Sequence, residues 1–278
     1  MRLRGQVTAR VGWGLLLGLL LVALVAPWLA PYDPRVMHTP LLSPSPAHLL
    51  GTNDVGQDIL SELLHGARFS LALAALASLL STTFGSLVGV VAGYYPRLGF
   101  ALMRVVDVFL AVPRFPLIIF LAAFLRPGFG TLLFFFVLFG WAKTARLLRA
   151  RVLQERSADY INAAIVIGAG DRRILFRHLL PSVLGLALVR FIDEFQHVLL
   201  AESGLSFLGL GDPTVKSWGA ILHYAFDYPI IFTSKVWLWW ALPPGLAITL
   251  VMLVLMAAGF VLETHFNPKV RKRGRYVM

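Results

Sequence analysis

The sequence repeatedly contains apolar runs long enough to cross a lipid bilayer. Val11 to Ala30 carries no charged side chain, and about 20 helical residues span the hydrocarbon core of a membrane. Further runs cover residues 70–94, 98–125, 131–142, 182–201 and 247–262. The run over 131–142 is short, so it must begin near Phe129 or extend into 143–149. With 58% hydrophobic and 14% charged residues, the chain is predicted to be an all-α membrane protein of about six transmembrane helices.

Composition excludes several classes of function. The net charge of +11 would suggest a nucleic-acid partner in a soluble protein, but in a membrane protein basic residues report topology. We therefore expect no nucleic-acid partner. Cysteine is absent, which excludes disulfides, thiolate metal sites and a cysteine nucleophile. No GxxxxGK[ST] phosphate loop or HExxH motif occurs and no Ser-His-Asp order stands out, so neither a nucleotide site nor an enzyme is predicted.

The distribution of basic residues predicts the orientation. If the N-terminus is inside, the inner segments hold 17 of the 25 Lys and Arg residues, the outer segments hold five, and three lie within spans. By the positive-inside rule, both termini are then cytoplasmic. Residues 1–30 are predicted to be an N-terminal transmembrane helix. A cleaved signal peptide is the alternative, because Ala23 and Ala26 offer small residues near a cleavage point.

Residues 31–69 are predicted to form an extracytoplasmic loop with one short helix. Asn53 or Asp54 can cap that helix, whose apolar stripe would be Ile59, Leu60, Leu63, Leu64 and Ala67. The helix would lie on the membrane surface or pack on other loops.

The longest polar interval, Asp159–Pro181, is predicted to be a cytoplasmic docking element. Asp159 can cap a helix that runs to Ile167, and Gly168 and Gly170 interrupt it. A second amphipathic helix would run from Asp171 and stop before Pro181. The alternative is a hairpin that rests on the bilayer.

Four ionisable residues lie on one face of the fifth span, at positions i, i+3, i+4 and i+7: Arg190, Asp193, Glu194 and His197. Charges at this depth should pair or face water. Three interpretations stay open: an Arg190–Glu194 pair to which His197 donates, a polar wall of a solute path, and a transition-metal site using Glu194 and His197.

Further hypotheses concern other charged residues in or near the spans. Glu202, at the outer end of the fifth span, would cap or gate the outer mouth or be solvated at the interface. Pro113 and Pro116 interrupt the run 98–125 and are predicted to kink it beside a cavity, and Asp107 and Arg114 could reach toward each other around Pro113. A self-contained ion-coupled transporter using Asp107, Asp193 and Glu194 is the alternative function.

Several motifs resemble the permease subunits of dipeptide, oligopeptide and nickel ABC importers. The stretch Asn162–Pro181 is similar to the EAA loop of ABC permeases, with Asn162 replacing the usual Glu. Gly51–Arg68 resembles the block GTDxxGRDxxSRxxxGAR. ESGLSFLGLG at 202–211, followed by SWG at 217–219, resembles a further block, whereas 259–268 follows the family ending only loosely.

The resemblance implies a type I ABC importer permease-like bundle in a bacterial or archaeal plasma (inner) membrane. Residues 70–265 would be the permease core of five transmembrane helices, with a coupling loop over 157–181, and 266–278 a basic cytoplasmic tail. The implied partners are a second permease subunit, two cytoplasmic ABC ATPase subunits and an extracytoplasmic solute-binding protein. This chain would bind no cofactor, because the partner ATPases use ATP and Mg.

Two groups of residues are candidates for functional roles: the first follows from the resemblance, and the second from the charged face of the fifth span and the position of Glu202. Those expected to contact the ATPase are Asn162, Ala163, Ala164, Gly168, Arg177, His178 and Pro181. Those expected along the translocation path are Arg190, Asp193, Glu194, His197 and Glu202. The solute, a peptide or a related small solute such as nickel, would be delivered by the binding protein.

Overall fold

The computed structural model of the chain describes residues 14, 17–18, 21, 24–125 and 128–266. Their elements are helical, and an isolated bridge between Thr52 and Asp58 is the only β pairing among them. In chain order the elements are η1 (Ala26–Leu29), α2 (Ile59–Tyr94), α3 (Pro96–Ala111), α4 (Arg114–Phe124), α5 (Phe129–Arg156), α6 (Asp159–Val166), α7 (Asp171–Ile174), η2 (Leu175–Leu179), α8 (Leu180–Phe207), α9 (Trp218–Asp227), α10 (Trp237–Trp240) and α11 (Leu242–Phe266). The all-α prediction is confirmed.

Within this part of the chain, four helical stretches are long and apolar enough to cross a membrane: 59–94, 129–156, 171–207 and 237–264. A fifth is possible if α3 and α4, which meet at a 75° bend, form one span. The bend lies at Val112 and Pro113, whose backbone is extended, as proline requires of the residue before it. The predicted break at Pro113 is therefore confirmed. Nine of the 20 residues of the predicted span 11–30 lie outside the described residues, so this span stays a prediction.

Helix α2 corrects the prediction for the segment before it. The residues expected to form a separate interfacial helix are the first turns of α2, which continues unbroken to Tyr94. Its N-cap is Asp58 rather than Asn53 or Asp54: the Asp58 carboxylate accepts from the Ser61 backbone N–H at 2.9 Å and from the Ser61 hydroxyl at 2.7 Å. A satisfied cap directly before Ile59 starts the helix there, and a second helix start further along is unnecessary.

Helices α2 and α5 pack closely because small residues line the contact. Gly85, Gly89 and Gly93 recur every four residues on one face of α2, and a methyl group at any of them would lie closer than 3.0 Å to α5 atoms. This is the small-xxx-small pattern of membrane helix pairs. The glycines of this span therefore account for the close approach of the two helices.

A second correction concerns Pro181, which does not end the helix before it. Helix α7 passes through the π-helical turn η2 into α8, and Pro181 lies in the first turn of α8. The Leu180 N–H donates to the Leu175 carbonyl, five residues earlier. This wider turn just before the proline relieves the clash that a proline makes in a regular α-helix.

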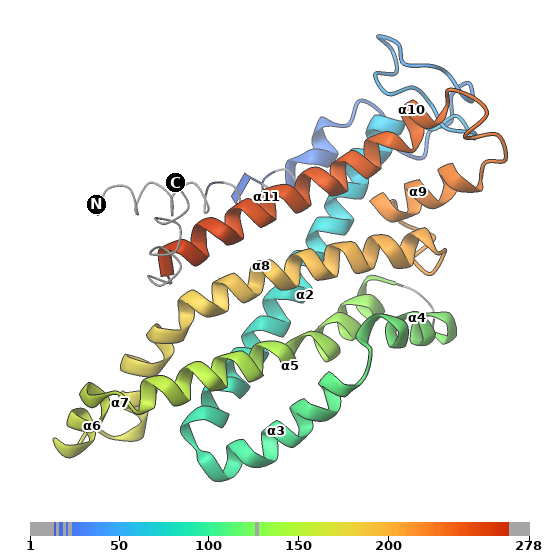
Figure 1. Cartoon of the computed structure of the whole chain (residues 1–278). Helices are drawn as coiled ribbons and strands as arrows, with labels where there is room; N and C mark the ends of the chain where they lie inside the picture. The colour runs from blue at the N-terminus through green and yellow to red at the C-terminus, as the bar shows by residue number, and fades with distance from the viewer. Residues whose placement is uncertain (1–13, 15–16, 19–20, 22–23, 126–127, 267–278) are drawn as a thin grey trace, which may run out of the picture.

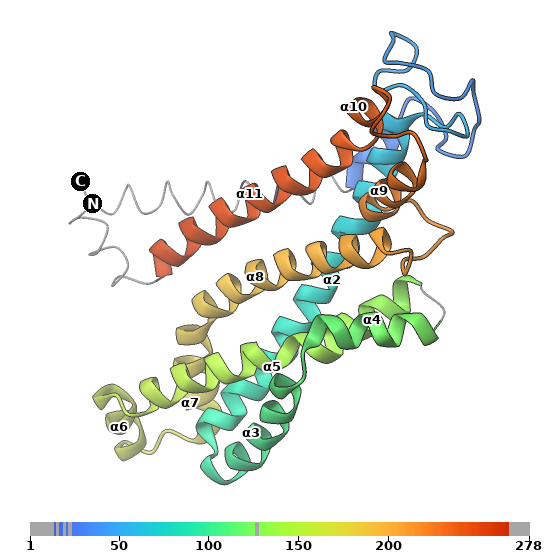
Figure 2. The same cartoon turned by 45° about the vertical axis from the view of Figure 1, so that its right-hand side comes forward.

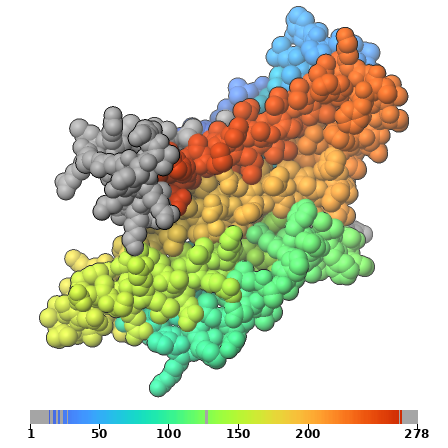
Figure 3. All heavy atoms as spheres, viewed as in Figure 1, coloured from blue at the N-terminus to red at the C-terminus, as the bar shows by residue number. Residues whose placement is uncertain are grey.

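The elements separate into two ends of an elongated bundle. Figures 1 and 2 show α6 and α7 at one end, and α9, α10 and the loops before α2 at the other. The space-filling view shows the same separation, with α11 lying along one side (Figure 3).

Candidate functional site

The first candidate region is the loop formed by α6, α7 and η2. Helix α6 ends in a Schellman motif, in which the Ala169 N–H donates to the Ala164 carbonyl and the Gly168 N–H to the Ile165 carbonyl. Gly168 adopts a φ of +86°, which glycine reaches without strain. The predicted interruption at Gly168 is confirmed, but Asp159 lies inside the first turn and does not cap α6, whose N-cap is Ala158.

Buried apolar side chains hold this loop against the ends of the spanning helices. Ile161 of α6, Ile174 of α7 and Leu179 of η2 are almost fully buried. They form one cluster with Val90 and Tyr94 of α2, Leu148 and Val152 of α5, and Val183 of α8. The loop is thus fixed to three spans through its inner face.

Polar contacts reinforce that attachment. Asp171, at the start of α7, accepts hydrogen bonds from the hydroxyls of Tyr94 at 2.7 Å and Tyr95 at 3.2 Å. The Tyr160 hydroxyl donates to Glu155 at 2.8 Å, and Arg151 pairs with Glu155 at 2.6 Å. Desolvation, together with the bond to Glu155, raises the pKa of the Tyr160 phenol.

The outer face of the loop is apolar and exposed. Val166 and Ile167 are 85% and 84% exposed, and Ile165 and Phe176 are also exposed. Of the predicted coupling residues, Asn162, Ala163, Gly168, Arg177 and Pro181 are exposed, whereas Ala164 and His178 are half-buried. The loop therefore presents both small and large apolar side chains at the end of the bundle.

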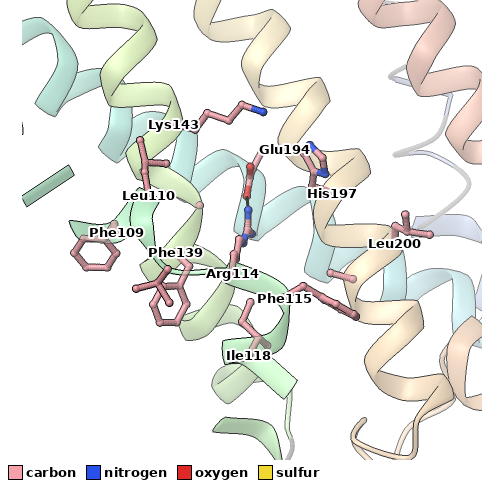
Figure 4. A pocket seen from close by; sticks show the side chains of 13 residues that line it. Phe109, Leu110, Arg114, Phe115, Ile118, Phe139, Lys143, Glu194, His197 and Leu200 are labelled. Carbon is pink, nitrogen blue, oxygen red and sulfur yellow. Dashed lines mark ion pairs between the residues drawn. The ribbon is translucent and has the colours of Figure 1, made fainter. Parts of the chain in front are cut away.

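The second candidate region is a cavity of about 480 Å³ between α3, α4, α5 and α8. Most of its wall is apolar, including Phe109, Phe115 and Phe139. Four ionisable side chains also line it: Arg114, Lys143, Glu194 and His197. Figure 4 shows Arg114 and Glu194 meeting at its centre, with the Lys143 side chain directed toward α8.

The ion pairs of the fifth span differ from the predicted ones. Arg190 Nη1 lies 2.7 Å from Asp193 Oδ2, and Glu194 Oε1 lies 2.6 Å from Arg114 Nη1. The predicted Arg190–Glu194 pair is therefore wrong, because Glu194 faces α4 rather than its own helix. Asp107 and Arg114 do not meet either, since Asp107 pairs with Arg146.

The approach of α5 to α8 at this cavity depends on Gly140. A Cβ at this position would lie 2.5 Å from Glu194 Oε1. Glycine here leaves room for the carboxylate beside Arg114. Lys143, one turn further along α5, is exposed and near enough to interact electrostatically with both Glu194 and His197.

Sequence reasoning missed Lys143 and Arg114 as cavity residues. The topology prediction counts Lys143 among the 17 inner basic residues. However, α5 continues 13 residues beyond Lys143. Its position directly after the charge-free stretch 129–142 was the available signal. Within the described residues, no three His, Cys, Asp or Glu side chains are grouped to hold a metal, so Glu194 and His197 have no third ligand there.

Glu202 does not lie in the cavity and is not solvated. Its side chain is fully buried and accepts hydrogen bonds from Ser70 at 2.9 Å and Ser206 at 2.8 Å. Ser70 also accepts from the Trp218 backbone N–H at 3.3 Å, and the Trp218 indole donates to the Leu63 carbonyl at 3.0 Å. The block Gly51–Arg68 and the blocks at 202–211 and 217–219 thus meet in space. The prediction that Glu202 is solvated at the membrane interface is wrong.

Comparisons with known proteins agree with these features. Residues 81–272 match the family described as binding-protein-dependent transport system inner membrane component, and residues 1–50 match the N-terminal TM domain of oligopeptide transport permease C. The resemblance to the dipeptide, oligopeptide and nickel permeases is confirmed.

Individual relatives cover nearly the whole chain. The Di/tripeptide transport system permease protein DppC of Pseudomonas aeruginosa is 36% identical, over 93% of this chain and 88% of its own. The Dipeptide transport system permease protein DppC of Bacillus subtilis is 33% identical, over 98% and 85%. The Nickel transport system permease protein NikC of Escherichia coli is 35% identical, over 90% of each. The chain therefore belongs to the family of binding-protein-dependent transport system inner membrane components.

Proposed function

We propose that this chain is a permease subunit of an ATP-driven ABC importer and forms half of the translocation pathway for peptides or a related small solute such as nickel. An extracytoplasmic binding protein delivers the solute, and a second permease subunit completes the path. Two partner ATPases bind ATP and Mg and carry out hydrolysis. Family membership and the names of the relatives support this proposal.

The observation that carries the coupling role is the exposed apolar tip of a firmly anchored loop. Val166 and Ile167 are largely exposed to water, and such a patch is typical of a protein contact. The exposed Ala163 lets a partner backbone approach. Because Ile161, Ile174 and Leu179 fix the loop to three spans, displacement of the tip would move those spans together. The residues proposed to couple to the ATPase remain Asn162, Ala163, Ala164, Gly168, Arg177, His178 and Pro181.

The cavity is the proposed half of the solute path. Lys143 and His197 are exposed although they lie within spanning helices. A charged side chain in lipid costs about 2.5–3.5 kcal/mol on insertion scales, so these groups should face water or the second permease. Arg114 and Glu194 join them in the path wall. Asp193 and Arg190 form a neighbouring pair beside it, and Glu202 is assigned a structural role instead.

We also propose an orientation with both termini in the cytoplasm, from the distribution of basic residues. The coupling loop then lies on the cytoplasmic side of the plasma (inner) membrane, within reach of the ATPases. The loops before α2 and around α9 lie on the outer side, where a binding protein would dock.

An ion-coupled carrier has no comparable support. A carboxylate that exchanges a proton or cation must be able to bind it, but Asp107, Asp193 and Glu194 each pair with an arginine, which favours the ionised carboxylate and competes with the transported ion. The relatives are also named as permeases of transport systems rather than as self-contained carriers.

The test is to place a charge on the loop tip. Val166→Asp should abolish solute uptake and co-purification of the ATPase subunits, because the carboxylate would have to be buried in the partner surface. For ATPase association the matched control is Val55→Asp, because Val55 is also exposed but lies at the opposite end of the bundle. Normal ATPase association of Val166→Asp would contradict coupling through this loop. ATP-independent uptake by the wild type would contradict the proposed function altogether.

A further inference from the structure

A second large pocket, of about 540 Å³, lies away from the cavity described above. The segment before α2 contributes Asp33 and Arg35, and α2 itself contributes Arg68, Phe69 and Ala72. Phe129, the first residue of α5, and the connection from α8 to α9 complete it. The pocket is therefore built from parts of the chain that are distant in sequence.

Basic side chains collect in this pocket. Of the five Lys and Arg residues assigned to the outer segments, three line it: Arg35, Arg68 and Lys216. Lys216 is already satisfied, since its ammonium pairs with Glu62 and donates to Gln57 at 2.7 Å. The guanidinium groups of Arg35 and Arg68 have no hydrogen-bond or ion-pair partner among the described residues.

The remaining polar groups leave one positive charge uncompensated. Asp33 contributes one carboxylate, which accepts the Arg35 backbone N–H at 2.9 Å. The His65 ring is engaged with the Ser61 carbonyl at 2.9 Å. Two guanidinium groups against one carboxylate therefore leave an excess of a single positive charge, which a monoanion would balance.

The pocket lies at the boundary between charged loops and apolar spans. Arg68 is the last charged residue of α2, and from Phe69 to Pro96 the sequence carries no charge. Helix α5 is likewise free of charge from Phe129 to Ala142. The rings of Phe69 and Phe129 lie 5.7 Å apart and, with Ala72, give the pocket an apolar floor.

We propose that this pocket binds one phospholipid, with its phosphodiester on Arg35 and Arg68 and the start of an acyl chain on Phe69, Ala72 and Phe129. Arginine forks suit phosphate oxygens, and a monoanionic phosphodiester balances the excess charge. A floor made by the first residues of two spans places the site at headgroup depth, where lipid phosphate is abundant. An acidic segment of a protein partner could pair with the two arginines but would not need the apolar surface formed by Phe69, Ala72 and Phe129.

The test uses the purified full-length chain and native mass spectrometry with dioleoylphosphatidylglycerol. Arg35→Gln with Arg68→Gln should weaken lipid retention about tenfold or more, because each guanidinium supplies a charge-assisted hydrogen bond. Lys235→Gln is the control, since Lys235 is exposed, assigned to the same side and absent from the pocket. Ala72→Trp should also weaken retention by filling the floor while leaving both arginines in place.

Any of five outcomes would overturn the proposal. One is unchanged lipid retention in the double variant, and another is unchanged retention in Ala72→Trp. Equal retention of dioleoylglycerol would show that the phosphate is not recognised, and equal competition by glycerol phosphate would indicate a free-anion site. Retained lipid with lost association of the binding protein would instead assign the two arginines to a protein partner. This test does not depend on ATP-driven transport.

Discussion

The Glu202 carboxylate of α8 accepts a hydrogen bond from the Ser70 hydroxyl of α2 at 2.9 Å, across 132 residues of sequence. Because Glu202 also accepts from Ser206, Glu202→Ala should leave both buried hydroxyl protons without an acceptor. We expect a loss of about 1–3 kcal/mol in the free energy of unfolding. Glu202→Gln keeps an acceptor and should lose much less. Thermal unfolding of both variants in detergent checks this, and equal loss in both would contradict a hydrogen-bonding role.

The pair formed by Arg114 and Glu194 allows structural and transport roles to be separated. Glu194→Gln leaves Arg114 without its counter-ion, and we expect a loss near the lower end of about 3–5 kcal/mol, since the Arg114 side chain is 26% exposed. Arg114→Met combined with Glu194→Leu removes both charges and should recover most of the stability. If the pair lines the path, uptake by the double variant should stay defective. Recovery of uptake together with stability would show that the pair is only structural.

Gly140 offers an independent test of the same site. Gly140→Ala places a methyl group 2.5 Å from Glu194 Oε1, so Glu194 or α5 must shift, at a cost of about 1–3 kcal/mol. Gly130→Ala is the control, because nothing lies within 4 Å of that position in the same helix. Gly140→Ala should lower the midpoint of thermal unfolding and the uptake rate, whereas Gly130→Ala should leave both near wild type. Equal behaviour of the two variants would exclude close packing of Gly140 against Glu194.

The sequence predicted the helices better than their contacts. Apolar runs and Pro113 located the spans and the bend, because bilayer thickness and proline stereochemistry act locally. The ion pairs of Glu194 and Asp107 were mispredicted, because the partner of a carboxylate depends on how separate helices cross. Glu202 looked solvent-exposed for the same reason: its burial depends on α2 and α9, which approach it from distant parts of the chain.

The loop formed by α6, α7 and η2 could be predicted only in part. Gly168 interrupts the helix as predicted, since a Schellman motif favours glycine at that position. The continuation through Pro181 was not predictable from proline rules alone, because the π turn η2 accommodates the ring. The sequence also did not predict which apolar residues of the loop are buried. Ile161 and Ile174 are buried because they pack on α2 and α5.

The backbone at Gly168 gives a prediction about the shape of the coupling loop. Gly168→Ala forces a side chain into the left-handed region at φ +86°, at a cost of about 1–2 kcal/mol. We expect weaker ATPase association and less uptake. Gly170→Ala is the matched control, since Gly170 has an ordinary φ of −71° and nothing lies within 4 Å of it. Similar ATPase association in both variants would show that the conformation at Gly168 does not position the tip.

Asn162 is exposed, and by the resemblance to the EAA loop it stands in place of an acid. An amide keeps its hydrogen-bonding capacity but loses the charge, so a contact with a basic residue of the ATPase should be weaker than a charge-assisted one. We expect Asn162→Glu to be tolerated or to tighten ATPase association, by up to about tenfold for one exposed charge-assisted bond. Pull-down of the ATPase subunits at low and high salt measures this, with Asn162→Gln as the uncharged control of equal length. A strong loss of association in Asn162→Glu but not in Asn162→Gln would show that the partner groove is adapted to a neutral residue.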